Sequence, residues 1–294
     1  MLNYEKMKRI AESELILHND GSVYHLRLHP EEIADKIILV GDPGRTELVA
    51  SFFDKVTVRR ENREIFTRTG TYKGKNITVL STGMGTDNLD IVVNELDALV
   101  NIDLKKRTIN KDHKSLTLVR IGTSGGIQPH IPVGSFLFSS HGVGLDGLLH
   151  FYADSSNYRD LTLEGELENQ IGWPSRWPSP YVVEADQELL KKLSQGHPNG
   201  LTMTASGFYG PQGRELRLPL HYPEFNDRVA MFHHNRFQVT NFEMETSALY
   251  GLSKMLGHKA CTGCVIIANR ADKTFIKDYK PKMNELVKLV LDRI

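Results

Sequence analysis

Glycines, with arginines or hydroxyl side chains beside them, stand at three points where an apolar run of this sequence ends. The segments are GDPGR at residues 41–45, STGMG at 81–85 and RIGTSGG at 120–126. Glycine lets backbone N–H groups approach an anion, and arginine adds a planar fork that matches phosphate oxygens. Any one segment is explained as well by an ordinary turn. Together, with Arg120 inside an apolar run, they favour an oxyanion site, because an unpaired buried charge costs several kcal/mol.

The usual nucleotide fingerprints do not fit these segments. Neither GxGxxG nor GxxxxGK[ST] occurs at any of the three. The sequence therefore favours free phosphate, rather than the phosphate tail of a nucleotide, as the anion.

A second group of functional side chains lies in FYGPQGR at residues 208–214, which combines aromatic rings, an amide and a guanidinium on one turn. An aromatic ring packs on the face of a flat polar ring, while Gln212 and Arg214 can hydrogen-bond to its edge. An ordinary surface loop is equally compatible with this segment. Further along, Glu243 and Glu245 flank a predicted helix start, where acidic side chains complement the helix dipole. One of them could instead bind a pair of ligand hydroxyls.

The elements that must position these groups alternate between strands and helices. Residues 36–40 and 264–268 have the length of buried strands, and the first leads through GDPGR into a helical pattern. Residues 86–100 predict a helix with one apolar face, and residues 281–294 predict an amphipathic closing helix. This alternation predicts one α/β domain with a largely parallel sheet, in which residues 154–180 form an irregular excursion.

The composition excludes several classes of protein. The chain has 294 residues, with 36 Lys+Arg against 36 Asp+Glu, which argues against a polybasic nucleic-acid-binding arm. Its apolar runs are far below the ~20 residues that a membrane helix requires, and its N-terminus lacks the apolar core of a secretory signal. We therefore expect a cytoplasmic protein without nucleic-acid or membrane partners. Cys261 and Cys264 are spaced CxxC but fall in a β-branched apolar run, so we expect buried core residues and no metal site.

Taken in order, the motifs of this sequence resemble those of the nucleoside phosphorylases, and within that family most closely those of the uridine-specific members. The resemblance runs from about His25 to the C-terminus and is carried by VYHLRL, GDPGR, NREIF, STGMG, RIGTSGGIQPHIPVG, FYGPQGR, NFEMET and IIANR. It implies a single α/β domain over residues 21–294, after an N-terminal extension of residues 1–20. That domain would have a distorted mixed central sheet flanked by helices. The resemblance also implies self-association into dimers or hexamers whose active sites are shared between subunits.

The resemblance assigns roles to individual residues. The implied phosphate ligands are Gly41, Arg45, Arg120, Thr123 and, from a neighbouring subunit, Arg63. The implied ribose ligands are Met244, Glu245 and, again from the neighbour, His25 at the 5′-hydroxyl. The implied base-binding residues are Ser124, Gly125, Phe208, Gln212, Arg214, Ile267 and Ala268, with Arg270 supporting the base-binding loop. Catalysis would be carried by Arg120, Arg214 and Gln212.

The implied reaction is the reversible phosphorolysis of uridine to uracil and ribose 1-phosphate in pyrimidine salvage. Purine-specific relatives carry an aspartate after the late strand, where this sequence has Asn269 and Arg270, although Asp272 lies only two residues further on. A purine nucleoside phosphorylase and a non-catalytic nucleoside-binding protein of the same fold are therefore the alternatives. A nucleosidase, which uses water, would not need the three arginines expected at the phosphate.

The resemblance implies no cofactor, with inorganic phosphate acting as co-substrate. A monovalent-cation site found in some members of the family uses a glutamate that matches Glu64. Asn88 stands where those members have a serine ligand, which argues against the ion.

Overall fold

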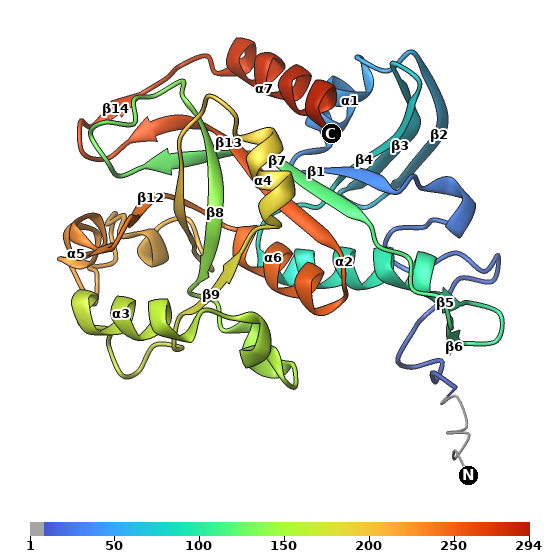
Figure 1. Cartoon of the computed structure of the whole chain (residues 1–294), viewed down its shortest axis with the longest axis horizontal. Helices are drawn as coiled ribbons and strands as arrows, with labels where there is room; N and C mark the ends of the chain where they lie inside the picture. Colours follow the sequence, from blue (N-terminus) through green and yellow to red (C-terminus); the bar gives the residue numbers. More distant parts are fainter. Residues whose placement is uncertain (1–8) are drawn as a thin grey trace. The chain divides into compact units, whose positions relative to one another are not determined.

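The computed structural model describes residues 9–294, which fall into two compact units. The first unit contains the described residues up to Gly83 together with Ile91–Thr117, and the second contains Met84–Asp90 and Leu118–Ile294. Each unit has its own strands and helices (Figure 1). Residues 1–8 of the expected N-terminal extension lie outside the described residues. The remainder of the extension belongs to the first unit, where the amide of Ile10 donates to the carbonyl of Arg107 over 2.8 Å.

The strands of the first unit form a mixed sheet in the order β1-β4-β3-β2. Their bounds are β1 Lys36–Val40, β2 Lys55–Asn62, β3 Ile65–Tyr72 and β4 Lys75–Ser81, with a separate small hairpin of β5 Ile102–Asp103 and β6 Thr108–Ile109. β1 and β4 are parallel, whereas β2, β3 and β4 are joined by tight turns and pair antiparallel. Tight turns permit only antiparallel neighbours, so the largely parallel sheet expected from the sequence is wrong for this unit.

The first helices begin close to the predicted places. α1 spans Pro43–Ala50 and α2 spans Thr86–Asn101, while η1 is a short 3-10 turn at Pro30–Glu32. The carboxylate of Asp42 accepts a hydrogen bond from the amide of Gly44 over 2.9 Å and so caps α1. Arg45 therefore lies in the first turn of α1, whereas the sequence placed the helical pattern after GDPGR. In α2, the side chains of Leu89, Val92, Val93 and Leu96 are all buried, as the periodicity predicted.

The strands of the second unit close on themselves. Their bounds are β7 Thr117–Gly126, β8 Phe136–Gly144, β9 Tyr181–Glu184, β10 Asn199–Thr204, β11 His233–His234, β12 Phe237–Glu243, β13 Lys259–Asn269 and β14 Thr274–Phe275. Neighbouring strands follow the order β11-β12-β10-β8-β13-β7, with β9 beside β8 and β14 beside β13. β12 also pairs antiparallel with β7, through Asn241 with Gly126 and Phe242 with Gly125. This last pairing completes the ring β7-β13-β8-β10-β12 and holds the ends of β7 and β12 together.

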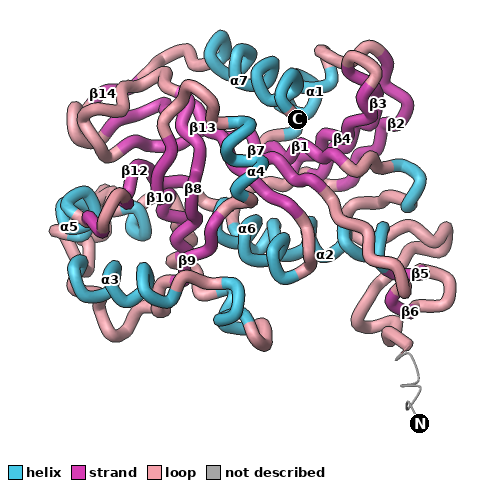
Figure 2. The backbone as a smooth tube through the Cα atoms, viewed as in Figure 1, coloured by secondary structure: helices cyan, strands magenta, loops and turns pink. Residues whose placement is uncertain are grey.

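Helices cover this closed sheet (Figure 2). Their bounds are α3 Leu161–Ile171, α4 Gln187–Leu193, α5 Phe225–Met231, α6 Thr246–Met255 and α7 Lys280–Arg293, with 3-10 turns η2 Leu148–Phe151, η3 Ser155–Tyr158 and η4 Gly210–Gln212. Val143, Leu201 and Met203 from the strands form one core cluster with Leu167 of α3 and Phe225 of α5. α7 packs on β13 through its apolar face, as expected for a closing amphipathic helix.

The α/β class with a mixed sheet flanked by helices is confirmed, and the excursion at residues 154–180 needs correction. It contains α3, which Asp160 caps by accepting from the amide of Leu163 over 2.9 Å. The sequence reading missed this helix because prolines and tryptophans follow directly behind it and make the segment as a whole look irregular.

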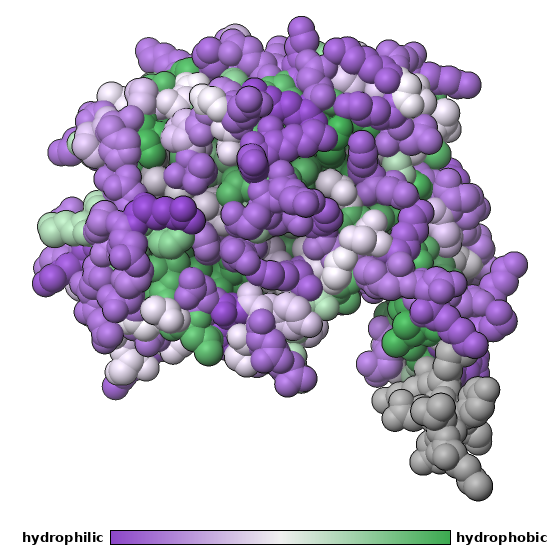
Figure 3. Space-filling model, viewed as in Figure 1, coloured by the Kyte–Doolittle hydropathy of each residue, from purple (hydrophilic) through white to green (hydrophobic). Residues whose placement is uncertain are grey.

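The surface drawn in Figure 3 is mostly hydrophilic, with hydrophobic residues in small separate areas. Among residues 9–294, no helix has the length and apolar character needed to cross a bilayer.

Candidate active site

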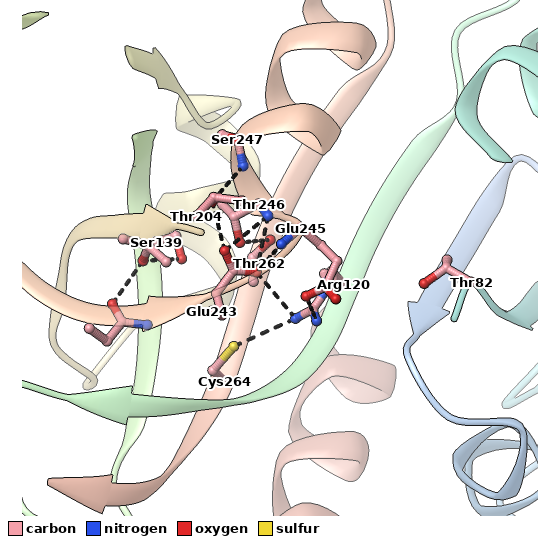
Figure 4. A network of polar contacts seen from close by, with 12 residues as sticks. Thr82, Arg120, Ser139, Thr204, Glu243, Glu245, Thr246, Ser247, Thr262 and Cys264 are labelled. Atoms are coloured by element: carbon pink, nitrogen blue, oxygen red, sulfur yellow. Dashed lines mark hydrogen bonds and ion pairs between the residues drawn. The ribbon is translucent and has the colours of Figure 1, made fainter. Parts of the chain in front are cut away.

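Three charged side chains meet in the interior of the second unit (Figure 4). Arg120 comes from the middle of β7, Glu243 ends β12, and Glu245 is the N-cap residue of α6. Each of the three is at most 5% exposed. Nη2 of Arg120 donates a short hydrogen bond to the carboxylate of Glu245, and Nη1 lies 3.6 Å from Oε2 of Glu243. The anionic partner expected for Arg120 is thus present as a pair of carboxylates of the protein itself.

Burial and charge oppose each other in this cluster. Burial alone lowers the pKa of Arg120, but the charges of Glu245 and Glu243 outweigh it and raise that pKa above its ordinary value. Burial raises the pKa of Glu245, and the charge of Arg120 acts against that rise. Arg120 therefore stays cationic, paired with carboxylates that also accept hydrogen bonds from backbone amides.

The two glutamates differ in their hydrogen-bond partners. Glu243 accepts hydrogen bonds from the hydroxyl of Thr204 over 2.7 Å and from the amides of Glu245 and Thr246 over 3.0 Å. These bonds satisfy the first N–H groups of α6, so Glu243 has the structural role that the sequence left open. Glu245 accepts from the amide of Gly85 over 2.9 Å in addition to Arg120, and it stands at the helix entrance. Met244, expected beside it at the ribose, is half-buried between them.

Gly122 of β7 has no side chain and so leaves space for the guanidinium of Arg120. A Cβ added to Gly122 would lie 2.0 Å from Nη1 of Arg120 and 3.1 Å from Sγ of Cys264. The sequence suggested that the glycine run of β7 leaves the strand as a turn, but β7 continues through Gly126, because pairing with β12 keeps it extended. Thr123 is half-buried on this stretch, whereas Ser124 and Gly125 are buried.

The segment 208–214 forms the second part of the site. Gln212 is 2% exposed, and its Oε1 accepts from Nη1 of Arg214 over 2.5 Å and from Nη2 of Arg270 over 3.1 Å. The guanidinium of Arg214 lies 3.9 Å from the ring centroid of Phe208, so the protein itself covers one face of this ring. A Cβ on Gly125 would lie 3.7 Å from Nη2 of Arg214, which places this segment next to the end of β7.

Arg270 holds the 208–214 segment in place through its guanidinium. Its guanidinium donates to the backbone carbonyl of Gln212 and, over 3.0 Å, to Oδ1 of Asn226. Burial, followed by the nearby charge of Arg214, lowers the pKa of Arg270 to about 10. Burial also lowers the pKa of Arg214. With a pKa of about 10, Arg270 stays cationic at neutral pH, so this part of the site presents positive charge.

The side chain of the last residue of β13 hydrogen-bonds to the protein's own backbone. Asn269 is buried and donates through Nδ2 to the carbonyls of Gln128 and Ile131, each over 2.8 Å. Ile267 and Ala268 before it are half-buried, and Asp272 is exposed in the turn that follows. The side chain of Asn269 is therefore engaged in hydrogen bonds that stabilise the fold.

A pocket of about 690 Å³ lies beside the 208–214 segment. Its walls include Leu145, Trp177, Tyr209, Pro211, Arg214 and Tyr222. Arg214 is the residue that this pocket shares with the predicted base-binding set. Trp177 and Tyr222 could not be recognised as wall residues from the sequence, because their approach to the 208–214 segment depends on the packing of α3 and α5 and leaves no local signal.

The remaining predicted residues lie in the first unit, where His25 and Arg63 are neighbours. Asn62 donates through Nδ2 to the carbonyl of His25 over 2.8 Å, and the guanidinium of Arg63 lies 5.9 Å from the ring centroid of Tyr24. Arg63 occupies the β2–β3 turn with a φ of 53° and is exposed, as is Glu64. Gly41 follows β1, directly before the cap of α1. In the second unit, the side chain of Asn88 donates through Nδ2 to the carbonyl of Met84 over 3.1 Å.

Comparison with known proteins gives one consistent result. The model of the phosphorylase superfamily matches residues 35–294. A uridine phosphorylase of Thermococcus kodakarensis is 30% identical over 271 residues, covering 92% of this chain and 86% of that protein. A purine nucleoside phosphorylase of the DeoD type from a Geobacillus species is 28% identical, covering 91% and 96%.

Solved structures agree with the sequence comparisons. A crystal structure of a Trypanosoma brucei nucleoside phosphorylase with uridine phosphorylase activity has a TM-score of 0.84 and 30% identity, covering 95% of this chain and 98% of that one. A uridine phosphorylase of Phytophthora capsici has a TM-score of 0.74 at 22% identity, which bears on the fold alone.

The close approach at Gly122 generates a stability prediction. Gly122→Ala forces the guanidinium of Arg120 away from its carboxylates, so the free energy of unfolding should fall by about 3 kcal/mol. Urea unfolding followed by circular dichroism measures the change. Gly165→Ala is the matched control, because α3 has nothing within 4 Å of a Cβ at that position. The control should gain roughly 0.5–1 kcal/mol from helix propensity. Equal stability of the Gly122→Ala variant and the native protein would contradict the role assigned to this glycine.

Proposed function

This chain belongs to the phosphorylase superfamily, and on that premise we propose that it catalyses the reversible phosphorolysis of uridine to uracil and ribose 1-phosphate. The named relatives above are nucleoside phosphorylases, with uridine and purine nucleosides as their stated substrates. Membership of the superfamily supports the reaction with phosphate. The choice of uridine depends on the residues of this chain.

The observation that carries the choice of base is the set of donors around Gln212. With Oε1 accepting from Arg214 and Arg270, the side-chain amide of Gln212 is oriented to donate through its nitrogen. Together with Arg214 it presents hydrogen-bond donors, which suit the carbonyl oxygens of uracil. Purine-specific members of the family protonate the purine N7 with an aspartate, whereas position 269 here holds an amide bonded to two backbone carbonyls.

The charge arrangement fits the bond-breaking step. As the glycosidic bond lengthens, the ribose gains positive charge and the departing uracil gains negative charge. Phosphate at Arg120 and Thr123 stabilises the ribose, and the guanidinium of Arg214 stabilises the base. Such donors are already oriented before charge develops, and losing one commonly costs about 3 kcal/mol of barrier.

Glu245 binds the ribose hydroxyls through lone pairs that Arg120 and Gly85 leave free. Gly41 and Arg45 remain predicted phosphate ligands.

We also propose that the protein self-associates and shares its sites between subunits. The neighbouring positions of His25 and Arg63 in the first unit support this, because one surface would then supply both residues to a partner's site. The proposal needs inorganic phosphate as co-substrate and no cofactor. The cytoplasmic location and the absence of a monovalent ion at Glu64 stay predictions.

A purine nucleoside phosphorylase is the second candidate, because relatives of that specificity match the chain at 28% identity over nearly its whole length. One assay decides between the two. Purified protein is incubated with uridine, thymidine or inosine, with and without phosphate, and free base is followed. We expect phosphate-dependent release of uracil. Faster release of hypoxanthine from inosine would favour the purine enzyme, and release without phosphate would point to a hydrolase.

Arg214 should matter in proportion to the charge on the leaving base. Arg214→Ala should lower kcat/KM for uridine about 100-fold. The loss should be smaller for 5-fluorouridine, because its base carries negative charge more easily and needs less stabilisation. Arg217→Ala, an exposed arginine on the rim of the same pocket, is the matched control and should stay near the native value. Equal losses for both nucleosides would refute the assignment of Arg214 to the leaving group.

Shared sites predict complementation between inactive variants. Arg63→Ala removes the partner's phosphate ligand, and Arg120→Lys keeps the buried charge but loses the planar fork. Each variant alone should lose most of its phosphorolysis. After the two are unfolded and refolded together, random dimers should recover about a quarter of native activity, since half are mixed and each mixed dimer has one intact site. Native mass spectrometry, which separates the two variants by mass, must show the mixed oligomer. No recovery in such a sample would exclude sharing by these two residues.

A further inference from the structure

Glu95 of α2 makes contacts that its own helix does not need. Its two carboxylate oxygens each accept a hydrogen bond from the amide of His25 over 3.0 Å, and Oε2 also accepts from the amide of Leu26 over 2.9 Å. Oε1 lies 2.5 Å from Nδ1 of the His25 ring. The Glu95 side chain is 12% exposed. A single carboxylate thus fixes both the backbone and the ring of a residue 70 positions away in the sequence.

The contact with Nδ1 decides which ring nitrogen of His25 carries the proton. A carboxylate is only an acceptor, so Nδ1 must be the donor in this hydrogen bond. In the neutral imidazole, Nε2 then keeps its lone pair and acts as an acceptor. The tautomer and the direction of Nε2 both follow from the position of Glu95.

Two further contacts restrict the His25 ring. The ring of Tyr24 meets it edge to face, with centroids 4.9 Å apart and planes at 88°. Asn62 donates to the carbonyl of His25 over 2.8 Å, which fixes the backbone on its other side. The side chain of His25 nevertheless keeps 28% of its surface exposed, so the ring is accessible to a ligand.

We infer that Glu95 is a positioning residue, which holds His25 as the tautomer whose Nε2 accepts a hydrogen bond from the 5′-hydroxyl of the nucleoside. This inference rests on the proposed function and on the role given there to His25. The alternative is that Glu95 only anchors the chain at His25 and Leu26. Because anchoring would affect every substrate alike, the two roles differ in their dependence on the 5′-hydroxyl.

The test compares uridine with 5′-deoxyuridine in the Glu95→Gln variant of the full chain. Glutamine has the same size and keeps an oxygen for the amides, but its NH2 group would face Nδ1 and favour the opposite tautomer. We expect kcat/KM for uridine to fall on the order of tenfold, the effect of one hydrogen bond, and that for 5′-deoxyuridine to stay within about twofold. On a His25→Ala background, Glu95→Gln should cause no further loss for uridine.

Controls separate this inference from the proposed function. Glu31→Gln, at an exposed glutamate of the first unit, should leave both substrates unchanged. Equal losses on both nucleosides, or no loss on either, would overturn the positioning role. If the native enzyme cleaves inosine in place of uridine, the base assignment fails. The same comparison is then made with inosine and 5′-deoxyinosine, and it still tests Glu95.

Discussion

The buried pairing of Arg120 with Glu245 and Glu243 is the interaction on which the site in the second unit depends. Charges taken out of water are tolerated only when each one is hydrogen-bonded, and here every partner also fixes a piece of backbone. Glu243 holds the first turn of α6, and Glu245 holds the amide of Gly85. A cation that must stay paired thus holds the middle of β7, the end of β12 and the start of α6 around one point.

The closed sheet explains why these groups can meet. The pairing of β12 with β7 brings Gly125 beside Phe242, and Glu243 follows within the same strand. Glycine at position 122 leaves the space into which Arg120 folds. The segment 208–214 joins the same region through Arg214 beside Gly125, and Arg270, the residue after β13, donates to the backbone of that segment. The strand ring therefore sets the distance between the predicted phosphate and base ligands of this unit.

A similar arrangement, in which a carboxylate of the protein fixes the direction of a cation or a ring, recurs in the first unit. Glu95 contacts the ring of His25 there, as Glu243 and Glu245 pair with Arg120 in the second unit. In each case the functional group gains a fixed direction because its polar atoms are already engaged on one side. Preorganisation of this kind reduces the reorganisation that a charged transition state would otherwise require.

The sequence alone determined the α/β class, the helix faces of α2 and α7 and the residue types suited to an anion and a flat polar ring, because these depend on local periodicity and side-chain chemistry. It did not reveal the ring closure of the sheet or the glycine run as strand, since neither has a local signal. It missed α3 although Asp160 and the spacing of Leu163, Leu167 and Ile171 are local helix signals, because the prolines and tryptophans behind them made the segment look irregular. Only the tertiary structure separated Glu243, which caps a helix, from Glu245, which pairs with Arg120. It also brought Glu95 to His25 across 70 residues, a contact made by packing between distant segments, which no sequence spacing encodes.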